Sequence, residues 1–216
     1  MPISTSKAEK RLIAAEARAI RARRLLEVGC FKGKTTAVLS RVAHENDGYV
    51  VAIDPMRWSS RPANMPEWID MVLHPFSYER AFWRNVSREG YPERVHLERG
   101  LSTDEGLVYS GAPHLREFDF VFIDGEHLYD AVLADFENWG RRVRAGGKVL
   151  FHDCVERFPE VIAAVRDIVE EGSLRYCVRW PEAATIAVLE VLEPSTGNDK
   201  TATAGDRTRE DSHPLD

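Results

Sequence analysis

Short apolar runs alternate along this chain with longer segments whose apolar residues recur at helical spacing. The apolar runs, which are typical of strands, cover residues 24–29, 49–54, 94–100, 118–125 and 148–153. The segments with helical spacing cover residues 6–23, 35–45, 77–90, 129–143 and 158–172. This alternation predicts a series of βαβ units.

The composition of the expected strands, and the short link between the last two of them, indicate which strands are parallel and which are antiparallel. "VVAID" and "DFVFID" are almost continuously apolar, as in a parallel sheet that helices cover on both faces. The last two strand-like segments, 174–180 and 184–192, are joined by only three residues, too few for a helical crossover. We therefore expect an α/β fold with a mostly parallel sheet and an antiparallel C-terminal hairpin at one edge.

The domain organisation follows from length and local composition. A chain of 216 residues fits one domain, which we assign to residues 1–193 with an N-terminal helix in 1–23. Residues 55–75 hold two Trp, three Met and four Pro, and we expect a substrate lid with Trp58 and Trp68 as walls. A dimer contact or simple loop packing is the alternative. Residues 194–216 contain no aromatic residue and one Leu, which predicts a disordered tail.

Composition and charge argue against a membrane protein, a secreted protein and a nucleic-acid-binding protein. With 44% hydrophobic and 30% charged residues, no apolar run of eighteen and no signal-peptide pattern, the sequence predicts a cytoplasmic protein without a membrane partner. A net charge of −6 gives no reason to expect nucleic acid. The three cysteines form no CxxC pair and are expected to be reduced. The basic first helix and the edge hairpin are surfaces on which a homo-oligomer could form.

The segment "LLEVGCFKGKTT", residues 25–36, is typical of a nucleotide-binding turn. A P-loop would need a glycine at Val28, although "FDFVFID" resembles the acidic strand of P-loop proteins, so an ATPase or kinase stays an alternative. A dinucleotide turn would need a glycine at Phe31. The pattern that fits is ExGxxxG, formed by Glu27, Gly29 and Gly33.

S-adenosylmethionine suits this pattern. It has no pyrophosphate to cradle, but it carries an ammonium, a carboxylate and a ribose. The glycines let the backbone approach a ligand, and Glu27 can orient the loop and the amino-acid end of the cofactor. The second strand ends at Asp54, where an acid can accept hydrogen bonds from both ribose hydroxyls.

Candidate chemistry lies at the ends of two further strands. Asp124 and His127 follow one strand, and His152 and Asp153 end the next. Methyl transfer to an alcohol requires removal of a proton, which His127 or His152 could accept, or which Mg²⁺ held by Asp124 and Asp153 could make more acidic. The alternatives are structural: His152 bonds a neighbouring strand end, His127 is a helix N-terminal residue, and Asp124 is the N-cap of the helix that starts near Tyr129.

The motif "IDGEHLYDAVLADFENWGRRVRAGGKVLFHDC" resembles the class I S-adenosylmethionine-dependent methyltransferases. Within them it is similar to the branch of small-molecule O-methyltransferases that act on sugars and other natural products, often grouped as family 24. The resemblance covers roughly residues 24–192. It implies a Rossmann-like sheet of seven strands, the last of them antiparallel, and an enzyme that methylates a hydroxyl of a small metabolite. A catalytically silent binding protein with the same fold is an alternative.

The resemblance also implies roles for single residues. Glu27, Gly29 and Gly33 would line the methionine end of the cofactor, Asp54 the ribose and Ser102 the adenine, with Asp124 also at the cofactor crevice. Related O-methyltransferases hold a metal at these strand ends, with a third oxygen ligand after the second acid. Here that position is Cys154, a poor ligand for Mg²⁺.

Overall fold

The computed structural model describes residues 5–56, 77–181 and 184–193. The expected lid, with Trp58 and Trp68, lies outside the described residues except for its first two positions. The expected disordered tail, 194–216, lies outside them altogether.

Seven strands form one sheet in the order β3-β2-β1-β4-β5-β7-β6. The strands are β1 Arg24–Val28, β2 Tyr49–Asp54, β3 Val95–Arg99, β4 Phe118–Ile123, β5 Val143–Phe151, β6 Tyr176–Arg179 and β7 Ala187–Val191. The first five are parallel, and β7 is antiparallel to both β5 and β6. The expected sheet with its C-terminal hairpin is confirmed. The strand order reverses between β1 and β4, the point at which α/β sheets bind ligands.

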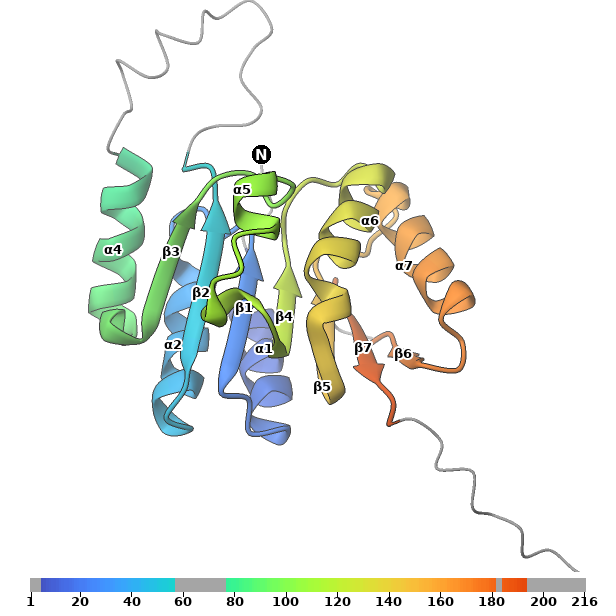
Figure 1. The fold of residues 1–216 in the computed structure, drawn as a ribbon, viewed down its shortest axis with the longest axis horizontal. Coiled ribbons are helices and arrows are strands. Elements are labelled where there is room, and N and C mark those ends of the chain that lie inside the picture. Colours follow the sequence, from blue (N-terminus) through green and yellow to red (C-terminus); the bar gives the residue numbers. More distant parts are fainter. Residues whose placement is uncertain (1–4, 57–76, 182–183, 194–216) are drawn as a thin grey trace, which may run out of the picture.

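Helices cover both faces of this sheet, as expected (Figure 1). Helices α1 Lys7–Ala19, α2 Lys34–Glu45 and α4 Ser77–Glu89 cover one face, and α5 Glu105–Val108, α6 Tyr129–Asn138 and α7 Pro159–Glu171 cover the other. Phe82 of α4 is fully buried in the first layer, and Phe136 of α6 is buried with Trp139 in the second. Burial of each such side chain stabilises the fold by about 1.5–3 kcal/mol.

The largest differences from the expected element boundaries lie at the ends of α1 and α6 and at the start of β5. The first helix ends at Ala19 and not at 23, because Arg21 takes a positive φ of 50° and turns the chain into β1. The helix expected over 129–143 ends at Asn138, and a short 3-10 turn over Gly140–Arg142 follows the buried Trp139. Strand β5 consequently begins at Val143, which pairs with Phe118 before a register shift.

The start of α1 lies at the carboxyl edge of the sheet, beside the start of α2. Ser6 caps this helix and forms a capping box with Glu9. The hydroxyls of Thr5 and Thr35 lie 3.2 Å apart, which joins the segment before α1 to the start of α2. The first helix therefore contributes residues to the edge where a ligand crevice is expected.

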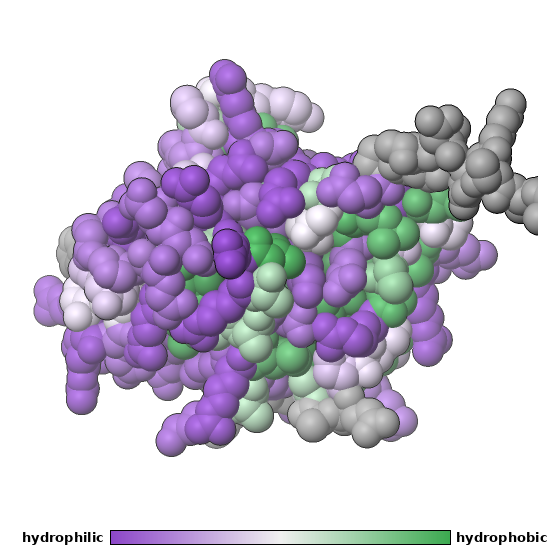
Figure 2. Space-filling view, turned by 90° about the horizontal axis from the view of Figure 1, so that it is seen from below, coloured by the Kyte–Doolittle hydropathy of each residue, from purple (hydrophilic) through white to green (hydrophobic). Residues whose placement is uncertain are grey.

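The surface seen from below the sheet is mostly hydrophilic, with small apolar groups between charged side chains (Figure 2). Within the described parts of the chain, no helix has both the length and the apolar character that crossing a membrane requires.

Candidate active site

Two glycines shape the loop between β1 and α2. Gly29 has a φ of 83°, and a Cβ there would overlap the carbonyl oxygen of Asp124 and lie 2.9 Å from the Cα of Gly125. Gly33 is the N-cap of α2 with a φ of 70°, and a Cβ there would lie 2.6 Å from the Phe82 ring. Glycine is required at Gly29 because the loop closely approaches the end of β4, and at Gly33 because a left-handed backbone there packs against Phe82 of α4.

Glu27, at the end of β1, is only 1% exposed and accepts a hydrogen bond from the hydroxyl of Thr36 on α2. Burial raises the pKa of Glu27 to about 8; the Thr36 bond opposes the rise, and the carboxylates of Asp124 and Asp54 add to it. The loop is therefore surrounded by acidic side chains, an environment that favours a positively charged ligand.

Asp54, at the end of β2, joins the glycine loop to the segment after β2. Its Oδ2 accepts the backbone N–H of Phe31 at 2.8 Å, and its Oδ1 accepts that of Met56 at 2.6 Å. Burial raises the pKa of Asp54, against the effect of these two bonds. Each carboxylate oxygen can accept a second hydrogen bond, so Asp54 can also accept from ligand hydroxyls.

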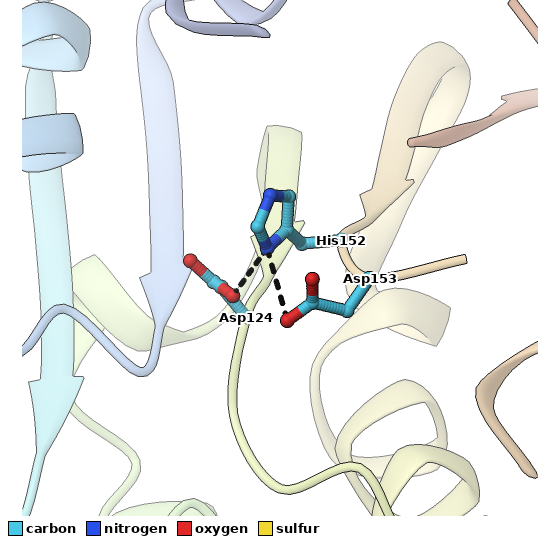
Figure 3. Close-up of side chains that lie close together, drawn as sticks. All are labelled: Asp124, His152 and Asp153. Atoms are coloured by element: carbon cyan, nitrogen blue, oxygen red, sulfur yellow. Dashed lines mark hydrogen bonds and ion pairs between the residues drawn. The ribbon is translucent and has the colours of Figure 1, made fainter. Parts of the chain in front are cut away.

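His152 lies between two carboxylates at the ends of β4 and β5 (Figure 3). Its Nδ1 is 2.8 Å from Asp124 Oδ1 and 3.4 Å from Asp153 Oδ2, and its side chain is 0% exposed. Burial by itself would lower the pKa of His152, but the hydrogen bonds with Asp124 and Asp153 raise it to about 10. The two hydrogen bonds therefore favour the charged form of the imidazole, while burial raises the pKa of its partner Asp124.

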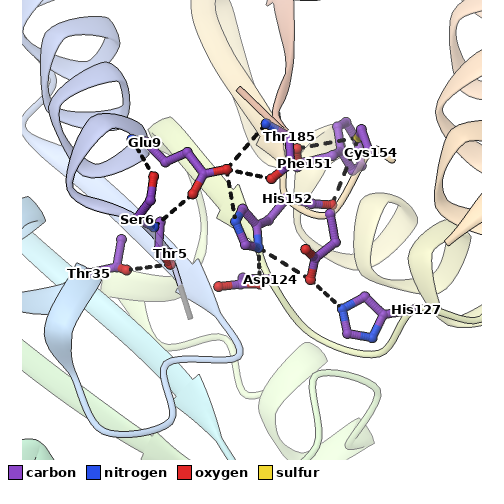
Figure 4. Close-up of polar contacts among 11 residues, drawn as sticks. Thr5, Ser6, Glu9, Thr35, Asp124, His127, Phe151, His152, Cys154 and Thr185 are labelled. Atoms are coloured by element: carbon purple, nitrogen blue, oxygen red, sulfur yellow. Dashed lines mark hydrogen bonds and ion pairs between the residues drawn. The ribbon is translucent and has the colours of Figure 1, made fainter. Parts of the chain in front are cut away.

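His127, in the loop after β4, contacts the same cluster (Figure 4). Its Nε2 is 2.7 Å from Asp153 Oδ2, and its ring stacks on Phe158 with centroids 4.2 Å apart. The bond with Asp153 raises the pKa of His127, against the effect of partial burial. The His127 side chain is 35% exposed, so unlike His152 it can meet a ligand from solvent.

Glu9, which sequence reasoning did not assign to the site, approaches the cluster from α1 (Figure 4). Its Oε1 lies 3.6 Å from His152 Nε2 and accepts hydrogen bonds from the hydroxyl and N–H of Thr185. Its Oε2 accepts the N–H of Ser6. The pattern Ser6-x-x-Glu9 predicts the capping box, but no local signal indicates the distant histidine.

The structure thus brings most of the predicted site residues to one edge of the sheet. Gly29 adjoins Asp124, and Asp124 joins Asp153 through His152, with His127 beside them. Ser102 lies after β3 and bonds Asp135 of α6. The alternative role of Asp124 as a helix cap is wrong, because the N-cap of α6 is Leu128 and the N–H of Tyr129 donates to Glu160.

A mostly parallel seven-stranded sheet with an antiparallel hairpin, a glycine loop after β1 and an acid at the end of β2 define a Rossmann-like class I methyltransferase domain. Comparison with known families agrees, because residues 26–154 match the family model described as a methyltransferase domain. The chain belongs to this methyltransferase family. The class expected from the sequence is confirmed, and the alternative of a P-loop ATPase or kinase is removed.

Individual relatives are distant. The chain is 23% identical over 149 residues to the uncharacterized protein R132 of Acanthamoeba polyphaga mimivirus, a match covering 68% of this chain and 59% of that protein. The chain therefore matches less than two thirds of that relative's length.

Solved O-methyltransferases share the fold. TomG of Streptomyces achromogenes, solved in complex with SAM, is 21% identical with a TM-score of 0.63, and the match covers 88% of this chain and 82% of that one. The Bacillus cereus O-methyltransferase, solved with SAH, is 18% identical with a TM-score of 0.63, covering 87% and 82%.

Proposed function

We propose that this chain binds S-adenosylmethionine above the ends of β1, β2 and β4 and transfers its methyl group to a hydroxyl of a small metabolite, such as a sugar or natural product. The observation that carries the proposal is that the half-exposed His127 and the glycine loop share one edge of the sheet, with Asp124 and Asp153 between them. The TomG and Bacillus cereus structures, which contain SAM or SAH, support the choice of cofactor.

The residues around the loop suit this cofactor. The carboxylates of Asp54 and Asp124 both lie close enough to Glu27 to raise its pKa. Negative charge on Asp54 and Asp124 attracts the sulfonium and the ammonium of S-adenosylmethionine and would repel a triphosphate. When bound, S-adenosylmethionine supplies an electrophilic methyl group and departs as a neutral thioether, so the leaving group needs no acid.

We assign removal of the acceptor proton to His127. Because the carboxylate of Asp153 can only accept, it holds the hydrogen on Nε2 of His127 and leaves Nδ1 as the basic nitrogen. Asp153 then stabilises the imidazolium that forms. His152, the other candidate base, is buried and already charged, so we propose that it positions Asp124 and Asp153 and accepts no proton from substrate.

The donor set at Asp124 and Asp153 does not suit Mg²⁺. This ion binds carboxylate oxygens and keeps several waters, whereas both carboxylates here bond the charged His152. Asp153 Oδ1 is buried from solvent and has no hydrogen-bond partner among the described residues. The Cys154 thiol faces the carbonyls of Phe151 and His152. Proton removal is therefore assigned to His127 alone.

We expect a chelator to leave methyl transfer unchanged, since no step depends on a metal. The measurement is the initial rate of S-adenosylhomocysteine formation with EDTA and then with excess Mg²⁺. If EDTA abolishes the rate and Mg²⁺ restores it, the prediction is wrong and Asp124 and Asp153 are metal ligands.

Asp54→Ala is expected to weaken the binding of S-adenosylhomocysteine by about 1–3 kcal/mol, the scale of lost charge-assisted hydrogen bonds. Isothermal titration calorimetry measures the effect. The matched control is Asp47→Ala, because Asp47 is an exposed acid before β2 that pairs with Arg94 at the opposite edge of the sheet. If wild type and Asp54→Ala bind S-adenosylhomocysteine with equal affinity, Asp54 does not bind the ribose.

The proposed function is tested by ligand binding and turnover together. S-adenosylhomocysteine should raise the Tm of the full chain, and ATP with Mg²⁺ should not. A panel of sugars and phenols then tests methyl transfer from S-adenosylmethionine. Binding without turnover of any acceptor would favour the catalytically silent alternative, and absence of binding would overturn the proposal.

A further inference from the structure

Glu9 of α1 is a buried acid beside the catalytic cluster that no step above uses. Its residue is 5% exposed. Its Oε1 accepts the N–H of Thr185 at 3.2 Å and also the Thr185 hydroxyl, and its Oε2 accepts the N–H of Ser6 at 2.7 Å. These three hydrogen bonds hold the carboxylate in one position and join the start of α1 to the segment before β7 (Figure 4).

Thr185 continues this connection into the chain after β5. Its carbonyl oxygen accepts the N–H of Cys154 at 2.8 Å, and this peptide group directly follows Asp153. On the other side of Asp153, the N–H of His152 donates to the carbonyl of Ile123 at the end of β4, at 3.0 Å. Asp153 therefore lies between two anchored neighbours, one held by β4 and the other by Thr185.

The backbone of Asp153 needs such anchors. Its φ is 56°, in the left-handed region that is unfavourable for residues other than glycine and that persists only where the surrounding structure holds it. From this backbone, the Oδ2 of Asp153 reaches Nε2 of His127 at 2.7 Å and Nδ1 of His152 at 3.4 Å. The position of the carboxylate beside His127 therefore depends on the contacts that hold the turn.

We propose that Glu9 is a positioning residue for methyl transfer, which holds the left-handed turn at Asp153 through Thr185 and thereby orients His127. A second contact acts in the same direction. Oε1 of Glu9 lies 3.6 Å from Nε2 of His152, the ring nitrogen that faces away from Asp153, so α1 also contacts the cluster directly. This inference rests on the proposed function, because the effect of Glu9 is exerted on the base that we assign.

The test is Glu9→Ala, which removes the acceptor of both Thr185 bonds. We expect kcat to fall by about 10- to 100-fold, the cost of a small misplacement of a catalytic group. The KM for S-adenosylmethionine should stay nearly unchanged, because Glu9 acts on the acceptor side of the reaction. Ser6→Ala is the matched control, because it breaks the same capping box and leaves Thr185 bonded to Glu9. It should keep the wild-type kcat.

A double-mutant cycle distinguishes positioning from general weakening of the fold. If Glu9 acts through His127, adding Glu9→Ala to His127→Ala should lower kcat no further. A loss that is merely structural would lower kcat by the same factor in both backgrounds. An acceptor with an acidic hydroxyl keeps the rate of the His127→Ala background measurable.

The outcomes separate this inference from the proposed function. If Glu9→Ala keeps the wild-type kcat, or loses the same factor in both backgrounds, the role of Glu9 is overturned and the proposed function stands. If wild type methylates no acceptor, the proposed function is wrong and the inference falls with it. Should Glu9→Ala fail to fold, Thr185→Val decides, because it removes only the hydroxyl that bonds Glu9. A lower kcat that disappears in the His127→Ala background supports the inference, and a wild-type kcat overturns it.

Discussion

His127→Ala is expected to lower kcat by about 100- to 10,000-fold, the usual contribution of a positioned general base. The imidazole that Asp153 orients is the group to which we assign the acceptor proton, and its removal leaves no other partly exposed imidazole in the cluster. The affinity for S-adenosylhomocysteine should stay nearly unchanged, because His127 acts on the acceptor. Steady-state rates and calorimetry measure the two quantities separately.

Two comparisons distinguish catalysis from a structural effect of His127→Ala. His114→Ala is the matched control, because His114 is also partly exposed and pairs with a carboxylate, Glu98, at 2.9 Å. It should keep the wild-type kcat. Acceptors with more acidic hydroxyls should lose less activity in His127→Ala, since they depend less on a base. A loss of the same size for all acceptors, or no loss, would contradict the assignment.

The fold could be predicted largely because local patterns in this chain agree with its tertiary structure. Apolar runs without alternation indicated a sheet covered on both faces, and the three residues between the strand-like segments 174–180 and 184–192 required an antiparallel hairpin. The exact ends of helices and strands could not be predicted, because they depend on contacts between residues far apart in the sequence. Val143 belongs to β5 because it pairs with Phe118, a residue 25 positions earlier in the chain.

The location of the site was predictable, but the roles within it were not. Adjacent parallel strands end at one edge, so Asp124 and Asp153 were expected near one another from sequence alone. The two histidines are equivalent candidates in the sequence. Only burial and partners separate them, because His152 is enclosed by carboxylates and His127 is open on one side. Their catalytic roles stay predictions until the variants are measured.

Gly29→Ala is expected to lower the free energy of unfolding by about 2–5 kcal/mol, combining left-handed backbone strain with a steric clash. The φ of Gly29 is 83°, and the new Cβ would overlap the backbone carbonyl of Asp124, which cannot rotate away as a side chain could. The loop would have to withdraw from the end of β4, so binding of S-adenosylhomocysteine should be lost as well. Urea unfolding and calorimetry provide the two measurements.

Gly111→Ala separates the two causes. Gly111 has a similar positive φ, 68°, but a Cβ there would meet nothing within 4 Å. This control should therefore lose only the strain component, about 1–2 kcal/mol, and should bind S-adenosylhomocysteine as wild type does. The difference between the two variants measures how closely the loop approaches Asp124. Equal destabilisation of both, with binding retained in Gly29→Ala, would mean that this approach is not needed for the cofactor site.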